Sequence, residues 1–342
     1  KLESVGFKVS KHDGCVFHKG RSLCVLYTDD SILVGPDQKE LDMIIKQIQS
    51  AGLDLTSEDG IDDFLGVTID YHNNGSIHMT QKRLIQSTLE DLGLNSQNAK
   101  CHATPMASHK LLSRHPDSPK FDESFNCCRV IGKLLFLEKS TRPDLSYAVN
   151  QCARFSHDPK KEHGEAVKRI GRYLKGTADK GLIMKPDSSG NLDLNVDADF
   201  AGNWDKSIAS TDPATAQSRH GYVLRYCGIP ILWASQMQHI IALSTTEAEY
   251  VGMSRALQDT LPVVWMSEEM KELGHIVHST AAQVHCKVFQ DNSGTFEITN
   301  NPKHCPRTKH INQRGHFFRS HVGKPIIVLP ISTKDQIAET FT

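Results

Sequence analysis

The sequence predicts a mixed α/β protein, and three observations lead to this fold class. Near the N-terminus, short apolar runs alternate with turn residues, which is typical of antiparallel hairpins. Three helical segments follow a polar stretch that contains prolines. Residues 191–342 begin with three strands in series and continue with alternating helices and strands, which indicates a mixed sheet with helices on its faces.

Length and composition narrow the class of protein. At about 150 residues per domain, 342 residues predict two or three domains. The 39 Lys and Arg against 40 Asp and Glu leave a net charge of −1, so contact with a polyanion must depend on local basic patches. The longest apolar runs, 23–27 and 325–331, are far shorter than the ~18 residues of a membrane span.

The cysteines and the first residue indicate the chain's context. Nine cysteines, none in a Cys-x-x-Cys pair, are typical of reduced thiols in the cytosol or nucleus and provide no zinc motif. Because residue 1 is Lys rather than Met, we expect the chain to begin inside a longer polypeptide.

The N-terminal part, residues 1–95, predicts two hairpins and two helices. Strands at 23–27 and 32–35 flank the acidic pair Asp29 and Asp30. A second hairpin joins 64–71 to 76–80 through Asn-Asn-Gly, whose last two residues suit the positive φ of a tight turn. Helical spacing covers 38–51 and 81–92, the latter ending at Gly93.

The middle part, residues 96–190, predicts a linker and a helical connection. Residues 95–122 are polar and hold three prolines, which favours a linker or an ordered strap across the surface. Helices are expected at 124–140, 143–157 and 159–176. The third has Asp158 as its N-cap and Pro159 at the first helical position.

The last part, residues 191–342, predicts five strands and three helices. The long helix begins with a capping box, because Ser244 precedes Glu247 by three residues. The strands are expected at 192–198, 221–227, 230–237, 284–290 and 325–331, and the helices at 245–272, 293–299 and 334–342.

Four acidic residues stand at strand or helix ends in this part: Asp197, Glu249, Asp291 and Glu339. Carboxylates that converge need compensating cations, and two Mg²⁺ ions roughly 3.5–4 Å apart are the usual device for phosphoryl transfer. Taken singly, each acid is better explained as solvent-facing or as a helix cap.

Neighbouring acids offer alternatives at two of these positions. Glu247 and Glu249 point to nearly opposite sides of the helix. The capping box accounts for Glu247, which leaves Glu249 for metals. Asp197 and Asp199 lie on one face of an ideal strand, so periodicity does not separate them.

Several motifs occur in collinear order along the chain. Five of them are 196–202 (Val-Asp-Ala-Asp-Phe-Ala-Gly), 244–250 (Ser-Thr-Thr-Glu-Ala-Glu-Tyr), 290–293 (Gln-Asp-Asn-Ser), 307–311 (Arg-Thr-Lys-His-Ile) and 335–339 (Asp-Gln-Ile-Ala-Glu). These five resemble the ribonuclease H domain of the Pol polyprotein of copia-type long-terminal-repeat retrotransposons. Its connecting region resembles 104–106 (Thr-Pro-Met), 141–144 (Thr-Arg-Pro-Asp) and 172–177 (Arg-Tyr-Leu-Lys-Gly-Thr), and its polymerase motif, usually Tyr-Val-Asp-Asp, resembles 27–30 (Tyr-Thr-Asp-Asp).

The resemblance implies roles for the acidic residues. Asp197, Glu249 and Asp291 would be the first three metal-binding carboxylates of a ribonuclease H site. Glu339 stands where the family has Asp, and its extra methylene could displace a metal by about an ångström at a cost of ~10²-fold in rate. The resemblance implies that Asp29 and Asp30 are metal-binding polymerase residues.

The polymerase part is expected to be incomplete. A third polymerase carboxylate lies upstream in this family, whereas only Glu3 and Asp13 precede Tyr27 here. The expected fold is therefore a truncated reverse transcriptase palm and thumb (1–95), a helical connection (96–190) and a ribonuclease H-like mixed five-stranded sheet with flanking helices (191–342).

Two basic surfaces are candidates for phosphate contact. The first, within 303–324, contains no Asp or Glu and provides Lys303, Arg307, Lys309, Arg314 and Arg319. Its alternative is an ordinary solvated face. The second, on the three central helices, is a weaker hypothesis that comprises Arg129, Lys133, Arg142, Lys160, Lys161, Lys168, Arg169, Arg172 and Lys175.

The expected activity is hydrolysis of the RNA strand in RNA–DNA hybrids, with two Mg²⁺ ions (or Mn²⁺) as cofactors. Expected partners are the hybrid, template and primer nucleic acid, and the upstream fingers and palm and the integrase part of the polyprotein. The resemblance implies cytoplasmic virus-like particles and the nucleus as locations. The alternatives are a catalytically decayed nucleic-acid-binding remnant and a domesticated scaffold protein.

Overall fold

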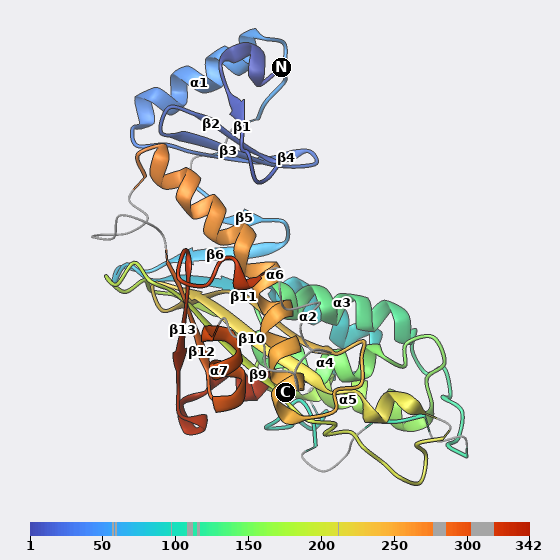
Figure 1. Cartoon of the computed structure of the whole chain (residues 1–342). Coiled ribbons are helices and arrows are strands. Elements are labelled where there is room, and N and C mark those ends of the chain that lie inside the picture. The colour runs from blue at the N-terminus through green and yellow to red at the C-terminus, as the bar shows by residue number, and fades with distance from the viewer. Residues whose placement is uncertain are drawn as a thin grey trace.

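The computed structural model describes residues 1–56, 58, 60–96, 98–107, 112–114, 117–210, 212–275, 285–301 and 318–342, and it contains three β-sheets (Figure 1). The N-terminal sheet has the antiparallel order β1 (Lys8–Val9), β2 (Val16–Lys19), β3 (Ser22–Tyr27) and β4 (Asp30–Val34). A 3-10 turn η1 (Glu3–Val5) precedes it, and α1 (Gln38–Ser50) packs on it through Ile44 and Ile48. The predicted β3–β4 hairpin and α1 are confirmed.

The second sheet has the order β5 (Asp63–Phe64), β6 (Val67–Tyr71), β7 (Ile77–Thr80) and β8 (Leu182–Met184), and α2 (Lys82–Asp91) follows β7. A continuous strand over 64–71 was wrong, because Leu65 and Gly66 both have positive φ and form a turn between β5 and β6. β8 was not predicted. It comes from about 100 residues downstream of β7, so only tertiary pairing defines it.

The central helices are α3 (Cys127–Ser140), the 3-10 turn η2 (Pro143–Leu145), α4 (Ser146–Ala153) and α5 (Lys161–Gly176). They enclose a core that includes Leu134, Val149 and Val167. Asp158 as N-cap of α5 was wrong: the cap is Lys160, whose backbone N–H donates to His163 Nδ1 at 2.9 Å. Asp158 instead pairs with the Lys160 ammonium at 3.0 Å.

The third sheet has the order β11-β10-β9-β12-β13. Its strands are β9 (Leu192–Ala198), β10 (Arg219–Tyr226), β11 (Ile229–Met237), β12 (Cys286–Gln290) and β13 (Ile326–Pro330). β10 is antiparallel to β9 and β11, whereas β9, β12 and β13 are parallel, so the predicted mixed five-stranded sheet is confirmed. The 3-10 turn η3 (Pro213–Ala216) precedes β10.

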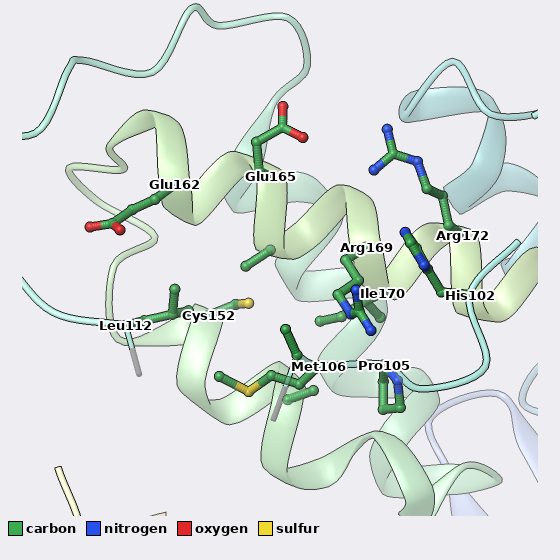
Figure 2. Close-up of a pocket in the computed structure, with 13 residues that line it drawn as sticks. His102, Pro105, Met106, Leu112, Cys152, Glu162, Glu165, Arg169, Ile170 and Arg172 are labelled. Atoms are coloured by element: carbon green, nitrogen blue, oxygen red, sulfur yellow. The ribbon is translucent and has the colours of Figure 1, made fainter. Parts of the chain in front are cut away.

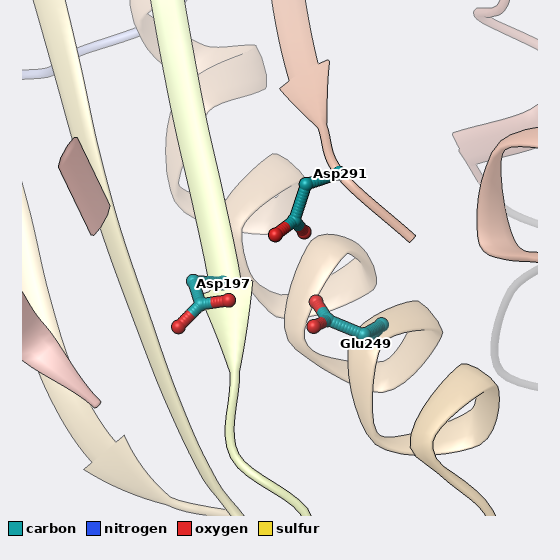
Figure 3. A group of neighbouring side chains, drawn as sticks. All are labelled: Asp197, Glu249 and Asp291. Atoms are coloured by element: carbon teal, nitrogen blue, oxygen red, sulfur yellow. The ribbon is translucent and has the colours of Figure 1, made fainter. Parts of the chain in front are cut away.

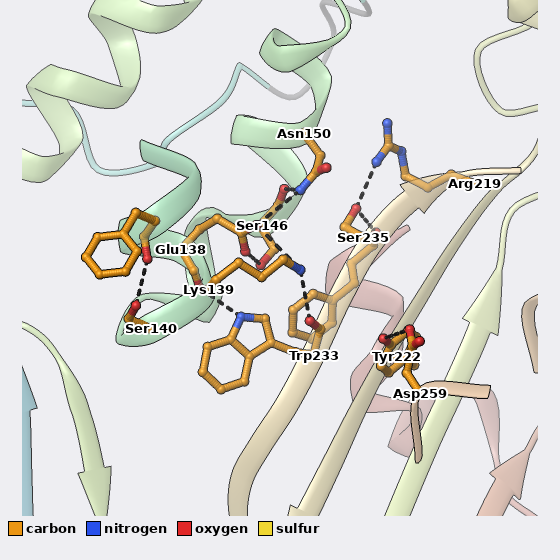
Figure 4. Close-up of polar contacts among 12 residues, drawn as sticks. Glu138, Lys139, Ser140, Ser146, Asn150, Arg219, Tyr222, Trp233, Ser235 and Asp259 are labelled. Carbon is orange, nitrogen blue, oxygen red and sulfur yellow. Dashed lines mark hydrogen bonds and ion pairs between the residues drawn. The ribbon is translucent and has the colours of Figure 1, made fainter. Parts of the chain in front are cut away.

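Helices cover both faces of this sheet (Figure 1). α6 (Thr245–Glu272) has the predicted bounds and buries Met253 and Leu257 against Leu194 and Val196 of β9. α7 (Ser293–Asn300) lies beside β12 and β13. On the other face, the Trp233 indole donates to the Glu138 carbonyl at 2.8 Å, and the Lys139 ammonium donates to the Trp233 carbonyl at 3.1 Å (Figure 4).

The C-terminal segment departs from the expected helix over 334–342. It forms two 3-10 turns, η5 (Thr333–Asp335) and η6 (Ile337–Phe341). Gln336 separates them with an extended backbone (φ −77°, ψ 95°), and its buried side chain binds strand backbones of the third sheet. Tertiary hydrogen bonds thus replace the helical ones that the spacing predicted.

The C-terminal end of α6 reaches the N-terminal sheet (Figure 1). The Glu269 carboxylate accepts from the Ser10 hydroxyl at 2.5 Å and from the Lys11 backbone N–H at 3.0 Å. One helix therefore contacts both the first and the third sheet. In the described ranges, no helix combines the length and apolar character that a bilayer crossing requires.

Candidate metal centre

Three carboxylates meet at one end of the third sheet (Figure 3). Asp197 lies near the end of β9, Asp291 directly follows β12, and Glu249 projects from the first turns of α6. One oxygen of each carboxylate lies within 4.8 Å of the others. The structure thus brings together three of the four acids that the sequence singled out in this part.

The gap that receives them is created by the sheet itself. β9 and β12 pair in parallel from Leu192 and Cys286 as far as Asn195 and Phe289. Beyond that pair no ladder contact joins the two strands, and Asp197 and Asp291 lie there. β9 is also where the strand order reverses, with β10 and β11 on one side of it and β12 and β13 on the other. Open sheets commonly bind ligands at such a point.

Local capping fixes the backbone around Asp291. Asn292 is the N-cap of α7, and its side chain accepts from the Thr295 N–H at 2.9 Å. Gly294 lets α7 approach α6, because a Cβ there would lie 2.7 Å from the Thr246 hydroxyl. The Thr295 hydroxyl also donates to the Thr246 carbonyl at 3.1 Å. The two helix starts are therefore held together, with Asp291 next to one and Glu249 on the other.

The start of α6 separates the two glutamates as the sequence predicted. The Ser244 hydroxyl accepts from the Glu247 N–H at 3.1 Å, and the Glu247 carboxylate accepts from the Leu243 N–H at 2.8 Å. Glu247 therefore serves the helix start, whereas Glu249 faces the cluster. Gly252, one turn on, allows close approach to the third sheet, since a Cβ there would lie 3.0 Å from His220 Cβ of β10 and 3.4 Å from Ala198 Cβ of β9.

Burial and nearby negative charge disfavour the charged state of Asp197 and Glu249. Burial, with the nearby Asp197 and Asp291 charges, raises the pKa of Glu249 to about 9. Burial also raises the pKa of Asp197, with smaller contributions from Asp291 and Glu339, against a hydrogen bond from Thr342 that lowers it. Glu249 Oε2 and Asp291 Oδ1 are buried without a hydrogen-bond partner. Unpaired carboxylate oxygens facing one another fit a divalent cation.

Glu339 lies near the cluster but outside the group of three. Its side chain is exposed, and its charge contributes to the raised pKa of Asp197. Two C-terminal hydroxyls were not anticipated from the sequence. The Thr342 hydroxyl donates to Asp197 Oδ2 at 2.5 Å, and the Thr333 hydroxyl donates to Asp291 Oδ2 at 2.9 Å. No sequence signal marks these two threonines.

Asp199, the alternative to Asp197, is engaged elsewhere. Its carboxylate accepts from the Arg219 backbone N–H at 2.5 Å, which ties the loop after β9 to the start of β10. Burial raises its pKa. This long-range hydrogen bond therefore decides between Asp197 and Asp199, a choice that periodicity left open.

The predicted polymerase pair lies apart from this cluster. Asp29 and Asp30 are exposed in the tight turn between β3 and β4, where Tyr27 pairs with Asp30 and Thr28 has a φ of 54°. Within the described ranges, neither residue belongs to a group of three potential metal ligands. Their catalytic role stays a prediction.

The first basic surface falls largely outside the described residues, which include none of Lys303, Arg307, Lys309 and Arg314. Arg319 is described and half-buried. Its guanidinium donates to the Ile298 carbonyl at 2.6 Å and lies 6.0 Å from the centre of the Tyr250 ring. Arg319 thus has intramolecular contacts, and its contact with nucleic acid stays a prediction.

The second basic surface was wrong at Arg142, and two further members have an acidic partner. Arg142 is buried against Asp144 at 2.8 Å, and Arg129 and Lys133 both pair with Asp91. Arg169 and Arg172 line a pocket of about 220 Å³ together with Glu162 and Glu165, and the two glutamates lie toward one end of α5 and the two arginines toward the other (Figure 2). Arg142 therefore drops out of the second basic surface, and the contact of its other residues with nucleic acid stays a prediction.

Comparison with known proteins identifies the family. The chain is 33% identical over 353 residues to the retrovirus-related Pol polyprotein from transposon TNT 1-94 of Nicotiana tabacum, and 33% identical over 347 residues to that from transposon RE2 of Arabidopsis thaliana. Both alignments cover 100% of this chain. The chain belongs to the copia-type retrotransposon Pol family.

The chain spans only part of these Pol relatives, 25% and 22% of their lengths. An uncharacterized mitochondrial protein of Arabidopsis thaliana is 30% identical over 67% of this chain and 89% of its own length. Among solved structures, LC11-RNase H1 in complex with an RNA/DNA hybrid has 13% identity and a TM-score of 0.31, covering 44% of this chain and 93% of that one. No family model matches the chain.

Proposed function

We propose that this Pol-family chain hydrolyses the RNA strand of RNA–DNA hybrids with divalent cations held by Asp197, Glu249 and Asp291. The observation that carries the proposal is the convergence of these three side chains, from two strand ends and a helix start, within 4.8 Å. Such a cluster is unfavourable without a cation and is the ligand set that Mg²⁺ prefers. Membership of the Pol family supports nucleic acid as the substrate.

Each residue has a defined part in this proposal. Asp197 and Asp291 are oriented by hydroxyl donors on one oxygen each, which leaves their other oxygens for a cation. Glu249 approaches from α6 with Oε2 unpaired. Mg²⁺ bound by these groups supplies activation of a water nucleophile and stabilisation of the leaving oxygen. Glu339 is close enough to add negative charge and serves as a fourth, outer carboxylate.

A panel of labelled nucleic acids tests the proposed substrate. Purified chain is incubated in Mg²⁺ with an RNA–DNA hybrid, duplex RNA, duplex DNA and single-stranded RNA of one sequence. We expect cleavage of the RNA strand in the hybrid alone, and none in EDTA. A parallel reaction in Mn²⁺ shows whether Mn²⁺ can replace Mg²⁺.

The same panel separates the rival functions. Binding of the hybrid in a gel-shift assay without cleavage in either cation supports the decayed, nucleic-acid-binding remnant. Equal cleavage of hybrid and duplex DNA contradicts a ribonuclease specific for hybrids. If the chain neither binds nor cleaves any of these nucleic acids, nucleic acid is excluded as the substrate and the scaffold alternative remains.

A further inference from the structure

We propose that Gln336 is a positioning residue that fixes the separation between the carboxylates of Asp197 and Asp291. The inference rests on the proposed metal centre. Gln336 lies on the C-terminal segment, between η5 and η6, and only 4% of its surface is exposed. Its side chain reaches the gap between β9 and β12 at the point where their pairing ends.

The amide of Gln336 joins the two strands just before the acidic residues. Nε2 donates to the Val196 carbonyl at 2.9 Å and to the Phe289 carbonyl at 3.3 Å. Val196 precedes Asp197, and Phe289 lies two residues before Asp291. Because the ladder between the strands ends at Asn195 and Phe289, this side chain replaces the backbone donor that a continued ladder would supply.

The orientation of the amide is fixed by a second buried amide. Asn195 Nδ2 donates to Gln336 Oε1 at 3.0 Å, which directs Nε2 toward the two carbonyls. Asn195 is held in turn, because its Oδ1 accepts from the Arg225 guanidinium at 3.2 Å. A reversed Gln336 amide would place its oxygen against two carbonyl oxygens, so only this orientation satisfies the site.

Gln336 also anchors the segment that carries the outer groups of the cluster. Its Oε1 accepts from the Ala338 N–H at 3.4 Å, and its carbonyl accepts from the Glu339 N–H at 3.3 Å. These bonds start η6, which brings Glu339 near Asp197 and ends with the Thr342 hydroxyl on Asp197. One side chain therefore links the two strands to the segment that orients Asp197.

Metal affinity is therefore expected to depend on Gln336, although this residue is not itself a metal ligand. Groups that orient the ligands of a metal change its affinity about 10- to 100-fold when they are removed. Gln336→Met keeps the length of the side chain and removes all of its hydrogen bonds. We expect this change to weaken Mn²⁺ binding about tenfold or more, and to lower kcat for hybrid cleavage while KM for the hybrid changes little.

Isothermal titration of the full chain with Mn²⁺ is the primary measurement, and hybrid cleavage is the second. The matched control is Gln151→Met in α4. Gln151 is also a fully buried amide, which donates to the Tyr147 hydroxyl at 3.2 Å and accepts from Arg154 at 3.1 Å. Its loss removes two side-chain hydrogen bonds, against four at Gln336, and neither of the two involves the three acids or η6. The Mn²⁺ affinity of Gln151→Met is therefore expected to equal that of the wild type.

A second variant protects the test against misfolding, which thermal unfolding detects. Gln336→Asn keeps the amide but shortens the side chain by one methylene, so that it cannot reach both carbonyls, and it is expected to weaken Mn²⁺ binding in the same direction. Unchanged Mn²⁺ affinity in either folded variant overturns the proposal, as does equal weakening in Gln151→Met.

The outcomes also separate this inference from the proposed function. If the wild type binds Mn²⁺, the Gln336 variants lose that binding and no hybrid is cleaved, the positioning role stands and the hydrolytic function fails. If the wild type cleaves the hybrid and Gln336→Met binds Mn²⁺ equally well, the function stands and the positioning role fails. A wild type that binds no Mn²⁺ overturns both.

Discussion

Glu249 shows at the scale of one residue what the cluster requires. Its carboxyl is buried beside two other acids, and one of its oxygens has no partner. With a pKa raised to about 9, it holds a proton at neutral pH when no cation is present. A divalent cation must displace that proton, so cation binding and proton release are coupled at this site.

This coupling predicts how stability depends on pH. In the folded protein Glu249 titrates near 9, and in the unfolded chain near its ordinary value of 4.5. Between these values the folded state binds more protons, so the free energy of unfolding of the metal-free protein falls as pH rises, by up to about 1.4 kcal/mol per pH unit. We expect thermal unfolding in EDTA to move to lower temperature from pH 7 to pH 9, and Mg²⁺ to oppose that shift.

Glu249→Gln is the control for this prediction. It removes the titrating group, so its unfolding temperature in EDTA should fall less between pH 7 and pH 9 than that of the wild type. Burial lowers the pKa of His220 to about 3. The range from pH 7 to pH 9 lies above this pKa, so His220 stays neutral throughout. An identical pH dependence in the two proteins would show that Glu249 is not the group responsible.

Glu339 provides a second prediction at this scale. If it contributes to cation binding, Glu339→Asp should raise hybrid cleavage, because the shorter side chain restores the acid that the family usually has. Glu339→Gln should lower cleavage, since a neutral amide attracts a cation less. Rates measured across a Mg²⁺ titration decide between these expectations. Identical rates and metal dependence in all three proteins would leave Glu339 as an exposed residue without a part in the site.

Residue types near strand and helix ends drew attention to the three clustered acids, and the resemblance to the copia-type family selected them. Asp197 lies near the end of β9, Glu249 in the first turns of α6 and Asp291 directly after β12, and the capping box correctly removed Glu247. Thr342 and Gln336 were not predictable in the same way. Their roles depend on hydrogen bonds to residues more than 100 positions away in the chain, which no local pattern encodes.

At the scale of elements, the C-terminal segment shows how tertiary contacts override local spacing. Apolar residues in 334–342 fit a helix, but the buried Gln336, Ala338 and Phe341 each bind or pack against the third sheet, and 3-10 turns result. Gly221 of β10 makes this docking possible, because a Cβ there would lie 2.4 Å from Phe341 Cβ and 2.9 Å from the Phe341 carbonyl carbon.

We therefore expect Gly221→Ala to displace the C-terminal segment. The added methyl group must move η6 away from β10, at a cost of about 1–3 kcal/mol in the free energy of unfolding, and should weaken Mn²⁺ binding because Thr342 leaves Asp197. Gly132→Ala in α3 is the control. Nothing lies within 4 Å of its added Cβ, so it should stabilise by about 0.5–1 kcal/mol. Equal unfolding temperatures and Mn²⁺ affinities for Gly221→Ala and the wild type would contradict this account of η6.

At the scale of the whole molecule, α6 connects the cluster to the N-terminal sheet. Glu249 lies near its start, and Glu269 near its end binds Ser10 and Lys11. The bounds of α6 and β9 agreed with prediction because both have strong local signals. β1, β2 and β8 were missed, since two to four residues carry little periodicity and only pairing with other strands defines them.

At the same scale, we predict that the purified chain extends no primer. Asp29 and Asp30 are exposed in a turn, and the acids that precede them in the chain are Glu3 and Asp13. The Asp13 carboxylate accepts from the Cys15 N–H at 2.8 Å and so has a local structural role. Template-dependent nucleotide incorporation by the purified chain, measured in Mg²⁺ and in Mn²⁺, should be absent. Incorporation that is lost in Asp29→Asn would contradict this prediction.

The most direct test of the central claim compares two changes of equal charge in the hybrid-cleavage assay. Asp291→Asn removes one carboxylate of the cluster, whereas Asp335→Asn removes an exposed carboxylate of the same C-terminal region as Thr333. We expect Asp291→Asn to lower the Mg²⁺-dependent rate by about 10²-fold or more, since metal positions then change, and Asp335→Asn to leave it unchanged. Equal rates for the wild type and Asp291→Asn would contradict the claim that Asp197, Glu249 and Asp291 carry the reaction.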